Sequence, residues 1–334
     1  MLGIDIGHHT LKVVEVKDGR LIGVKESLLP GRLAGEVDAE EVSGSLQEIV
    51  ADMSARKKAA WSCIGGASVI TNLTDYPDME RSELDGAVRL EAEQFLSRDW
   101  NDMDFDYQIL EKLGEGGLRV LFAAAPKALS NRTISLLKAA GLYPVGISAA
   151  SMAMARAFQE VQKRTGSRED REKGVVLIDI GATNTCIALL EGTRIVVMRD
   201  IAFGGNDINK SLQKEFEANF DEAEAVKTRW GEPETRVLDC VERSIRPLLQ
   251  QISITMGYEH RQKRSGENAI YLAGGGCRAP GLPEMIGERF DLPVSFFNPF
   301  SGFDSECHLP DNERTLSTYS IAIGCALIGE EEYG

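Results

Sequence analysis

A four-residue motif occurs twice in this chain, and the two copies lie about half a chain length apart. Ile-Asp-Ile-Gly stands at positions 4–7 and again at positions 178–181, an offset of 174 residues. The apolar pattern after each copy is also alike, and Arg20 and Arg194 begin a further β-rich run at the same offset. Two copies of strand, turn, strand, turn and strand predict a duplicated α/β fold with two lobes that face each other. One aspartate from each copy would then border a single cleft.

The stretch between the two copies has the pattern of a separate β/α unit. Its expected elements are helices at Ser82–Leu96 and Asn131–Ala140 and strands at Asp106–Leu110 and Leu118–Ala125. We interpret residues 69–147 as a subdomain inserted in the first lobe. From Asp75 to Asp106 it has eleven Asp or Glu residues against three Arg, which fits either a solvated surface or a docking face for a basic peptide.

The region after the second copy is mainly helical. Helices are expected to begin at Gly204-Gly205, and at Asp221 with a capping box of Asp221 and Glu224. The remaining expected elements are a helix at Val237–Met256 that buries Val241, Ile245, Leu249 and Ile252 and kinks at Pro247, a strand at Ala269–Ala273, and a last helix at Leu316–Ile328 with a small, apolar face.

The expected domain boundaries follow from these elements. They are a first-lobe core at 1–68 and 148–172, the inserted subdomain at 69–147, a second-lobe core at 173–203 and 267–313, a helical subdomain at 204–266, and a C-terminal helix at 314–334 that packs back on the body of the protein.

The formal net charge of −15 limits the partners that this chain can bind. An acidic protein repels nucleic-acid backbones and anionic lipid, and the one small basic run, Arg261–Arg264, is interpreted as a solvated helix end. No stretch approaches about eighteen consecutive apolar residues, and Met1–Asp5 lacks the basic start and apolar run of a signal peptide. The six cysteines occur singly, so reduced thiols are expected. We expect a cytoplasmic protein that binds no nucleic acid and inserts no segment into a membrane.

The two repeated turns offer what a nucleotide polyphosphate needs, namely backbone N–H donors, a cation and carboxylates for a hydrated metal. In the first turn, Gly7 allows close approach of the backbone, Thr10 offers a hydroxyl and Lys12 can reach a phosphate oxygen. In the second, Thr183 and Thr185 are the expected donors. A single Asp-x-Gly turn is also found in ordinary hairpins, but its duplication at a domain-scale distance favours a binding site.

Two further features would complete such a site. Gly274–Gly276 follow a strand and precede Pro280-Gly281-Leu282, which opens a helix, so a flat ligand could lie against bare backbone. Glu224 and Lys227 lie three residues apart on one helical face, where they form either an ordinary surface ion pair or a ligand contact.

The order of these elements resembles the actin-like ATPase superfamily: phosphate turn, second phosphate turn, Ala-Glu-x-x-Lys, then Ala-Gly-Gly-Gly. Within it the chain resembles the PilM family of type IV pilus assembly proteins over nearly its whole length, and less closely the FtsA cell-division family. The segments that carry the PilM resemblance are Glu91–Leu96, Ala139–Leu142, Phe203–Gly205, Pro280–Leu282 and Asn298–Phe300. The resemblance implies an actin-like (ribonuclease H-like) duplicated fold with an inserted β/α subdomain in the first lobe.

The resemblance also implies roles for individual residues. Phosphate and magnesium would be handled by Asp5, Lys12, Asp179 and Gly181, with Asp5 and Asp179 holding Mg²⁺ through water. Glu224 and Lys227 would contact the ribose and base of ATP or ADP, and Gly275 and Gly276 the adenosine. The whole set expected at the nucleotide is Asp5, Gly7, His8, His9, Thr10, Lys12, Gly181, Ala182, Thr183, Asn184, Gly205, Glu224, Lys227, Gly274, Gly275, Gly276 and Arg278.

The sequence departs from the superfamily pattern at two places. Hydrolysis needs a carboxylate or amide that orients the attacking water where the chain re-enters the first lobe, and this stretch reads Ser148-Ala149-Ala150-Ser151. His8 and His9 stand where relatives tend to have small hydroxyl residues; they would either touch phosphate, or one would be exposed and neutral. We therefore assign no catalytic residue and expect slow or absent hydrolysis.

PilM-like proteins bind the short cytoplasmic tail of a membrane partner, PilN, in a groove of the first lobe beside the inserted subdomain. The resemblance thus implies an adaptor at the inner membrane of a type IV pilus or type II secretion machine, in contact with other assembly components. Two rivals are a small-molecule kinase, which would need an acidic base near the γ-phosphate, and an FtsA-like filament protein. The latter usually ends in an amphipathic membrane helix, whereas this sequence ends in acidic Glu330–Gly334.

Overall fold

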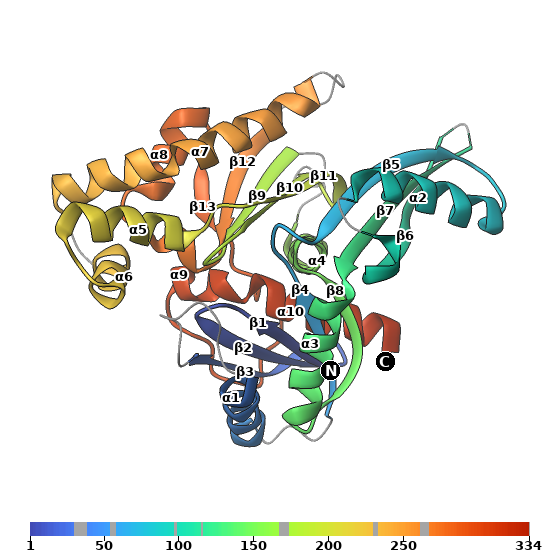
Figure 1. Cartoon of the computed structure of the whole chain (residues 1–334), viewed down its shortest axis with the longest axis horizontal. Helices are drawn as coiled ribbons and strands as arrows, with labels where there is room; N and C mark the ends of the chain where they lie inside the picture. The colour runs from blue at the N-terminus through green and yellow to red at the C-terminus, as the bar shows by residue number, and fades with distance from the viewer. Residues whose placement is uncertain are drawn as a thin grey trace.

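The computed structural model of the chain describes residues 1–29, 39–53, 58–96, 99–114, 116–166, 174–229, 233–260 and 267–333. It has two lobes, each built on a five-stranded sheet, and a three-stranded sheet to one side (Figure 1). Each large sheet contains one copy of the repeated segment, which confirms the predicted duplicated, two-lobed α/β fold. The basic run Arg261–Arg264 lies outside the described residues.

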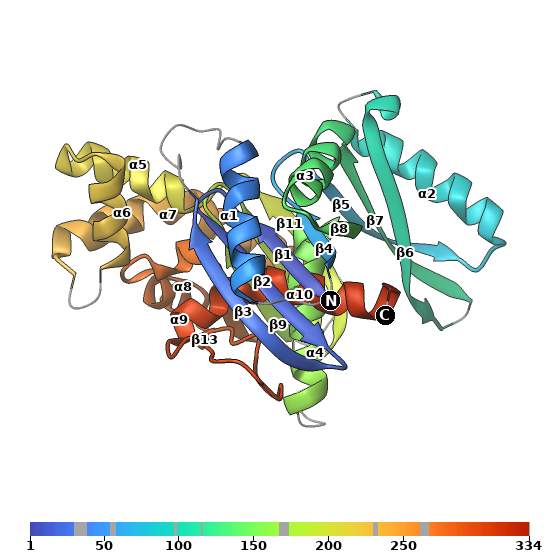
Figure 2. The same ribbon diagram turned by 90° about the horizontal axis from the view of Figure 1, so that it is seen from below.

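The first-lobe sheet has the strand order β3-β2-β1-β4-β8. Its first three strands form an antiparallel meander, and β4 and β8 continue it in parallel. Helices α1 and α3 cover its outer face (Figure 2), where Ile4 packs with Leu46 of α1 and Leu137 of α3. The bounds are β1 Leu2–Ile6, β2 Thr10–Lys17, β3 Arg20–Leu28, α1 Ala39–Asp52, β4 Ala59–Ile64, α3 Lys127–Ala139 and β8 Tyr143–Ala149.

The second-lobe sheet repeats this arrangement in the order β11-β10-β9-β12-β13. Ile4 pairs with Val13 in the first sheet, and Ile178 pairs with Ile187 in the second, so the registers match at the offset of 174. The β-bulge before Val16 recurs before Leu190. The duplication therefore includes the hydrogen-bond register of each meander. The bounds are β9 Gly174–Ile180, β10 Thr185–Glu191, β11 Arg194–Ile201, β12 Glu267–Ala273 and β13 Val294–Phe296.

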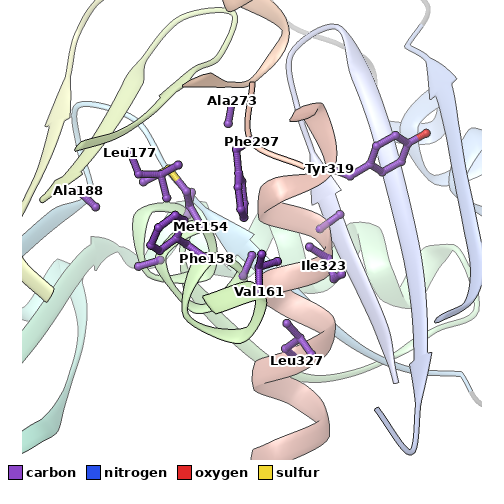
Figure 3. Close-up of a cluster of buried hydrophobic side chains, with 14 of the residues drawn as sticks. Met154, Phe158, Val161, Leu177, Ala188, Ala273, Phe297, Tyr319, Ile323 and Leu327 are labelled. Atoms are coloured by element: carbon purple, nitrogen blue, oxygen red, sulfur yellow. The ribbon is translucent and has the colours of Figure 1, made fainter. Parts of the chain in front are cut away.

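Two helices, α4 (Ala150–Thr165) and α10 (Ser320–Tyr333), form a layer between the two large sheets. Figure 3 shows Phe158 of α4 and Ile323 of α10 within a core that also takes Leu177 from β9. The last helix was predicted at Leu316–Ile328 with one apolar face. Instead a short helix α9 (Glu313–Leu316) precedes α10, and α10 is buried on nearly all sides because its first ten residues are almost all apolar or small.

The contact between these two helices is a close approach of backbones. A Cβ atom built on Gly324 of α10 would lie 1.8 Å from the carbonyl oxygen of Ala153 of α4. Gly3 of β1 meets α10 in the same way, with a built Cβ 2.0 Å from the Ala322 oxygen. Gly324 therefore sets the distance between the two helices, and Gly3 sets the distance between α10 and the first-lobe sheet.

The inserted sheet has the order β5-β7-β6 and is covered on one face by α2. Leu84 and Val88 of α2 pack on Phe122 of β7. Glu91, from the segment that resembles PilM, accepts hydrogen bonds from Thr74 and Tyr76 of β5 and so ties the helix to the sheet. The bounds are β5 Ile70–Pro77, α2 Arg81–Phe95, β6 Met103–Leu113 and β7 Gly117–Pro126.

Two elements of the range 69–147 lie with the first-lobe sheet instead of the inserted sheet. Strand β8 pairs in parallel with β4, and α3 packs against α1, because both present apolar faces to the first-lobe core. The chain therefore returns to the first lobe before position 148. The remaining domain boundaries stay proposals.

The helical subdomain contains α5 (Gly205–Phe216), α6 (Phe220–Thr228) and α7 (Thr235–His260, with Pro247 inside), followed after β12 by α8 (Leu282–Phe290). The predicted capping box was wrong: Asn219 and Glu222 form it, and Asn is as good an N-cap as Asp. In α7, Leu248 is fully buried where Leu249 was predicted, because a spacing of 3.6 residues per turn departs from a strict repeat of four.

Charged side chains join the inserted sheet to the second lobe. Arg119 of β7 is 6% exposed and donates to both oxygens of Asp75, at 2.6 and 2.7 Å. Its Nη1 also lies 3.3 Å from Glu111, whose Oε1 is 2.5 Å from Nε of Arg194 on β11. A bulge in β6 just before Glu111 shifts the register there, and bulges commonly redirect a side chain.

Within the described residues, no helix combines the length and apolarity needed to cross a membrane.

Replacing Gly324 with alanine should destabilise the protein, because the new methyl group has no room beside Ala153. We expect the free energy of unfolding to fall by about 1–3 kcal/mol, measured by chemical denaturation. The matched control is Gly86→Ala on α2, where an added Cβ meets nothing within 4 Å. Alanine there should stabilise by roughly 0.5–1 kcal/mol. Equal effects of the two substitutions would contradict the proposed close approach.

Candidate nucleotide-binding cleft

A cavity of about 400 Å³ lies between the lobes, at the ends of β1 and β9 where the two repeated turns meet. Every residue predicted to contact nucleotide or metal lines it, with the exceptions of Thr183 and Thr185. Thr183 is exposed at the rim, with its hydroxyl 3.4 Å from a ring nitrogen of His8. The structure thus brings together four sequence segments that are far apart along the chain.

The first turn, between β1 and β2, is closed by its own backbone. The N–H of Gly7 donates to the Thr10 carbonyl at 3.0 Å, and a Cβ at Gly7 would lie 2.8 Å from that oxygen. Lys12 is 7% exposed; its Nζ donates to the Thr10 hydroxyl at 2.6 Å and lies 3.8 Å from Asp5. The turn therefore presents a buried cation and a hydroxyl to the cleft.

The second turn, between β9 and β10, has the same geometry. The N–H of Gly181 donates to the Asn184 carbonyl at 2.9 Å. The predicted donor role of Thr185 was wrong, because its side chain is fully buried and donates to the backbone oxygen of Phe203. The Thr185 side chain points away from the cleft, and its hydrogen bond ties β10 to the segment that follows β11.

The two repeated aspartates, of which Asp179 is buried and Asp5 is 14% exposed, are electrostatically linked. Burial raises the pKa of both carboxyls above the ordinary value of 3.8, that of Asp179 to about 6, and the negative charge of Asp5 contributes to the rise at Asp179. Ser320, the first residue of α10, donates to Asp179 at 2.6 Å. In the described residues, no group of three or more His, Cys, Asp or Glu side chains is arranged to hold a metal. Two carboxylates suit a divalent cation that keeps most of its waters.

The glycine-rich turn after β12 lies directly against the second aspartate turn. Gly274 has φ of +82°, and a Cβ there would lie 2.4 Å from the Ile180 oxygen and 2.5 Å from Asp179 Oδ1. Only glycine fits this backbone conformation and this space without strain. The turn then leads into a 3-10 helix, Gly275–Arg278, of which Gly275, Gly276 and Arg278 line the cavity.

Glu224 and Lys227 form an ion pair in which Lys227 is buried and Glu224 is partly exposed, not the surface pair that was the simpler interpretation. Nζ of Lys227 lies 2.6 Å from Oε2 of Glu224, and Lys227 is only 2% exposed. Burial lowers the pKa of Lys227. For Glu224, burial opposes ionisation, but the charge and hydrogen bonds of Lys227 and the amide of Asn209 outweigh it, so the pKa of Glu224 is lowered.

The two histidines of the first turn both contact the second lobe. His8 is exposed, and burial of part of its ring, together with the charge of Arg132, lowers its pKa, which favours the neutral form. His9 packs edge-on against Phe220 of α6, with ring centroids 5.3 Å apart. These contacts bridge the mouth of the cleft.

Several residues that line the cleft escaped the sequence analysis, among them Glu26, Arg132 and Cys186. Glu26 lies opposite Lys12 in the register of β2 and β3, and Asp200 lies opposite Cys186 in β10 and β11. Both pairs obey the offset of 174, so a longer comparison of the repeat would have found them. Cys186 is a buried thiol whose pKa is raised by burial, and it donates to Asp200 at 2.9 Å. The second lobe thus has a neutral group where the first has a cation.

At the point of re-entry into the first lobe, Ala150 is the residue of the stretch 148–151 that lines the cavity. Strand β8 ends at Ala149 and α4 begins at Ala150. This stretch therefore contributes a methyl group where a water-orienting carboxylate or amide was sought.

Duplicated sheets with an aspartate turn from each lobe at one cleft define an actin-like protein. The family model described as type IV pilus assembly protein PilM matches residues 3–330, and the chain belongs to that family. A solved chain of the PilM-PilN type IV pilus biogenesis complex superposes with a TM-score of 0.84 at 24% identity, over 98% of both chains.

More distant relatives share the fold. EutJ from Carboxydothermus hydrogenoformans is 16% identical with a TM-score of 0.56, over 98% of this chain and 89% of that one. MreB5 of Spiroplasma citri, solved with bound AMPPNP, is 13% identical with a TM-score of 0.53, over 99% and 95%. In sequence, ethanolamine utilization protein EutJ of Escherichia coli is 25% identical over 44% of this chain, and FtsA of Streptococcus pneumoniae is 20% identical over 54%. These two matches span less than half of the length of either relative, 45% and 43%.

Replacing Asp179 with asparagine should stabilise the protein when no metal is bound. The pKa of Asp179 is raised to about 6, so its ionisation disfavours the folded state, a cost that is present above that pH and absent below about pH 4. We expect a gain of roughly 2–3 kcal/mol at pH 7.5 in EDTA that shrinks as the pH falls toward 4, measured by chemical denaturation. Asparagine can still accept from Ser320. A loss of stability at pH 7.5 would contradict this account.

Proposed function

We propose that this protein is an ATP-binding adaptor of a type IV pilus, or related type II secretion, assembly complex at the inner membrane. In this proposal it binds the cytoplasmic tail of a PilN-like membrane protein and hydrolyses ATP slowly or not at all. The observation that carries the proposal is the convergence of the predicted nucleotide residues on one cleft, in a chain of the PilM family. Its place would be the cytoplasmic face of the membrane, reached through the partner.

The charges of the cleft support a triphosphate with a divalent cation. Asp5 and Asp179 are buried near each other, and Lys12 is the cation beside Asp5. Mg²⁺ would relieve the repulsion between the two carboxylates, and Lys12 and the N–H groups of the turns would face phosphate oxygens. The bound Mg²⁺ would supply charge neutralisation, while Glu224 and the glycine-rich turn would receive the nucleoside.

The side chains that line the cleft where the chain re-enters the first lobe support slow turnover of ATP. Phosphoryl transfer to water needs a group that orients the attacking molecule. The stretch Ser148–Ser151 provides only Ala150 to the cavity, so ATP would act as a conformational ligand that contacts both lobes. A ligand of this kind biases the relative orientation of the lobes.

The partner site is expected in a groove of the first lobe beside the inserted subdomain. Closure of the cleft could change the shape of that groove, because two contacts join the inserted sheet to the second lobe. Glu111 pairs with Arg194 at 2.5 Å, and Thr71 of β5 donates to Asp200 at 3.5 Å. Asp200 in turn accepts from Cys186, which lines the cleft. The inserted sheet would therefore follow the second lobe when nucleotide draws the lobes together.

Isothermal titration with Mg-ATP, together with a phosphate-release assay, tests the nucleotide part of the proposal. We expect binding with negligible release, and binding at least about tenfold weaker for Asp179→Ala because a metal contact is lost. Rapid release would favour an enzyme, and no binding of ATP or ADP would mean that the fold is present without a working site.

Titration of a PilN-tail peptide, with and without Mg-ATP, tests the partner and the coupling. We expect the peptide to bind and its affinity to change with nucleotide, and we expect Glu111→Gln or Arg194→Gln to reduce that change toward none. In a double-mutant cycle, the effects of the two substitutions on the nucleotide-dependent change in peptide-binding free energy should be non-additive by roughly 0.5–1 kcal/mol. Arg246→Gln, which removes an exposed pair within α7, is the control. Failure of the peptide to bind would count heavily against the adaptor.

A further inference from the structure

A buried amide that the nucleotide-binding pattern does not include lies directly behind Glu224. Asn209 of α5 is fully buried, and its Nδ2 donates to Oε2 of Glu224 at 2.6 Å. Nζ of Lys227 donates to the same oxygen, also at 2.6 Å. Among the described residues, no hydrogen-bond donor reaches the second oxygen, Oε1. Both protein donors therefore hold one side of the carboxylate and leave the other side available.

The helices fix this geometry from two directions. Glu224 and Lys227 share α6, whose start is set by the Asn219–Glu222 capping box, whereas Asn209 comes from the neighbouring helix α5. A single donor on a long, flexible stem such as lysine allows a carboxylate to rotate about its last bond. A second donor on a short side chain from another helix removes that freedom.

Burial of the Asn209 amide at this position in α5 also costs folding free energy. A buried amide away from water is unfavourable unless it is hydrogen-bonded, and asparagine is a poor residue for a helix interior. Its Oδ1 has no partner within the described residues. The bond to Glu224 is the hydrogen bond of this side chain that offsets the cost.

We propose that Asn209 is a positioning residue that turns Oε1 of Glu224 toward the cleft to accept from a ribose hydroxyl, so that the cleft selects ribonucleotides over deoxyribonucleotides. Glu224 lines the cavity and Asn209 does not, so Asn209 acts through Glu224. The lowered pKa of Glu224 keeps the carboxylate ionised and purely an acceptor. A deoxynucleotide would leave this charged acceptor without its donor, and sites built for a hydroxyl reject the analogue that lacks it. The inference rests on the proposed binding of ATP.

The test is the affinity of ATP, 2′-dATP and 3′-dATP for the full chain, measured by isothermal titration. The wild type should bind ATP at least about tenfold more tightly than one of the two deoxy analogues. Asn209→Leu, which keeps the number and branching of the side-chain heavy atoms but removes the donor, should weaken ATP by a similar factor and leave that analogue nearly unchanged, so the ratio falls toward one. Asn219→Ala, which loosens the start of α6, is the structural control and should weaken all three nucleotides in parallel.

Two results would overturn the inference while the proposed function stands: equal affinity of the wild type for all three nucleotides, or a parallel loss of all three in Asn209→Leu. Unchanged ATP affinity in that variant would overturn it as well. A thermal melt of the variant close to that of the wild type separates loss of positioning from loss of fold. If the wild type binds no adenine nucleotide, the proposed function fails, and the inference fails with it.

Discussion

The close contact of α4 with α10 fixes how far apart the two lobes stand, and the cleft depends on that distance. Backbones meet at Gly324 and Ala153 without an intervening side chain, and the helical layer buries apolar side chains of both sheets. The same layer reaches the site, because Ser320 at the start of α10 donates to Asp179. A small change in this packing would move one aspartate turn relative to the other. The layer is therefore both the core of the fold and the support of the site.

In the cleft beside this layer, the arrangement of charged side chains is energetically unfavourable when no ligand is bound. Two carboxylates lie in a buried place where water cannot solvate them well, and one lysine offsets them only in part. A ligand that brings positive charge to the carboxylates and negative charge to the lysine would relieve this electrostatic cost, and the relief would favour its binding. Glu224 and Lys227, which also line the cleft, neutralise each other.

Much of the fold and of the site could be predicted because duplication leaves its pattern in local sequence. The repeated Asp-x-Gly turn, the glycines at 274–276 and the Glu224–Lys227 spacing can each be seen within a stretch of a few residues. What could not be predicted depends on tertiary packing. Three examples are the burial of Lys227, the inward side chain of Thr185 and the bond from Asn209 to Glu224. Each depends on contacts between segments that are brought together only when the helices and sheets pack. The shifted capping box at Asn219 shows that local rules alone leave such choices open when two acceptable caps lie two residues apart.

The pair Lys12 and Cys186 shows how the duplicated halves have ceased to be equivalent. They occupy matching positions, yet one is a lysine and the other a neutral thiol, while Glu26 and Asp200 opposite them are both acidic residues. A pocket with true two-fold symmetry would accept an elongated ligand in either of two directions. At this pair of positions a cation is present in the first lobe only, so an elongated ligand with one anionic end would meet different partners in its two orientations. The difference at this one pair of positions is enough to break the two-fold symmetry of the cleft.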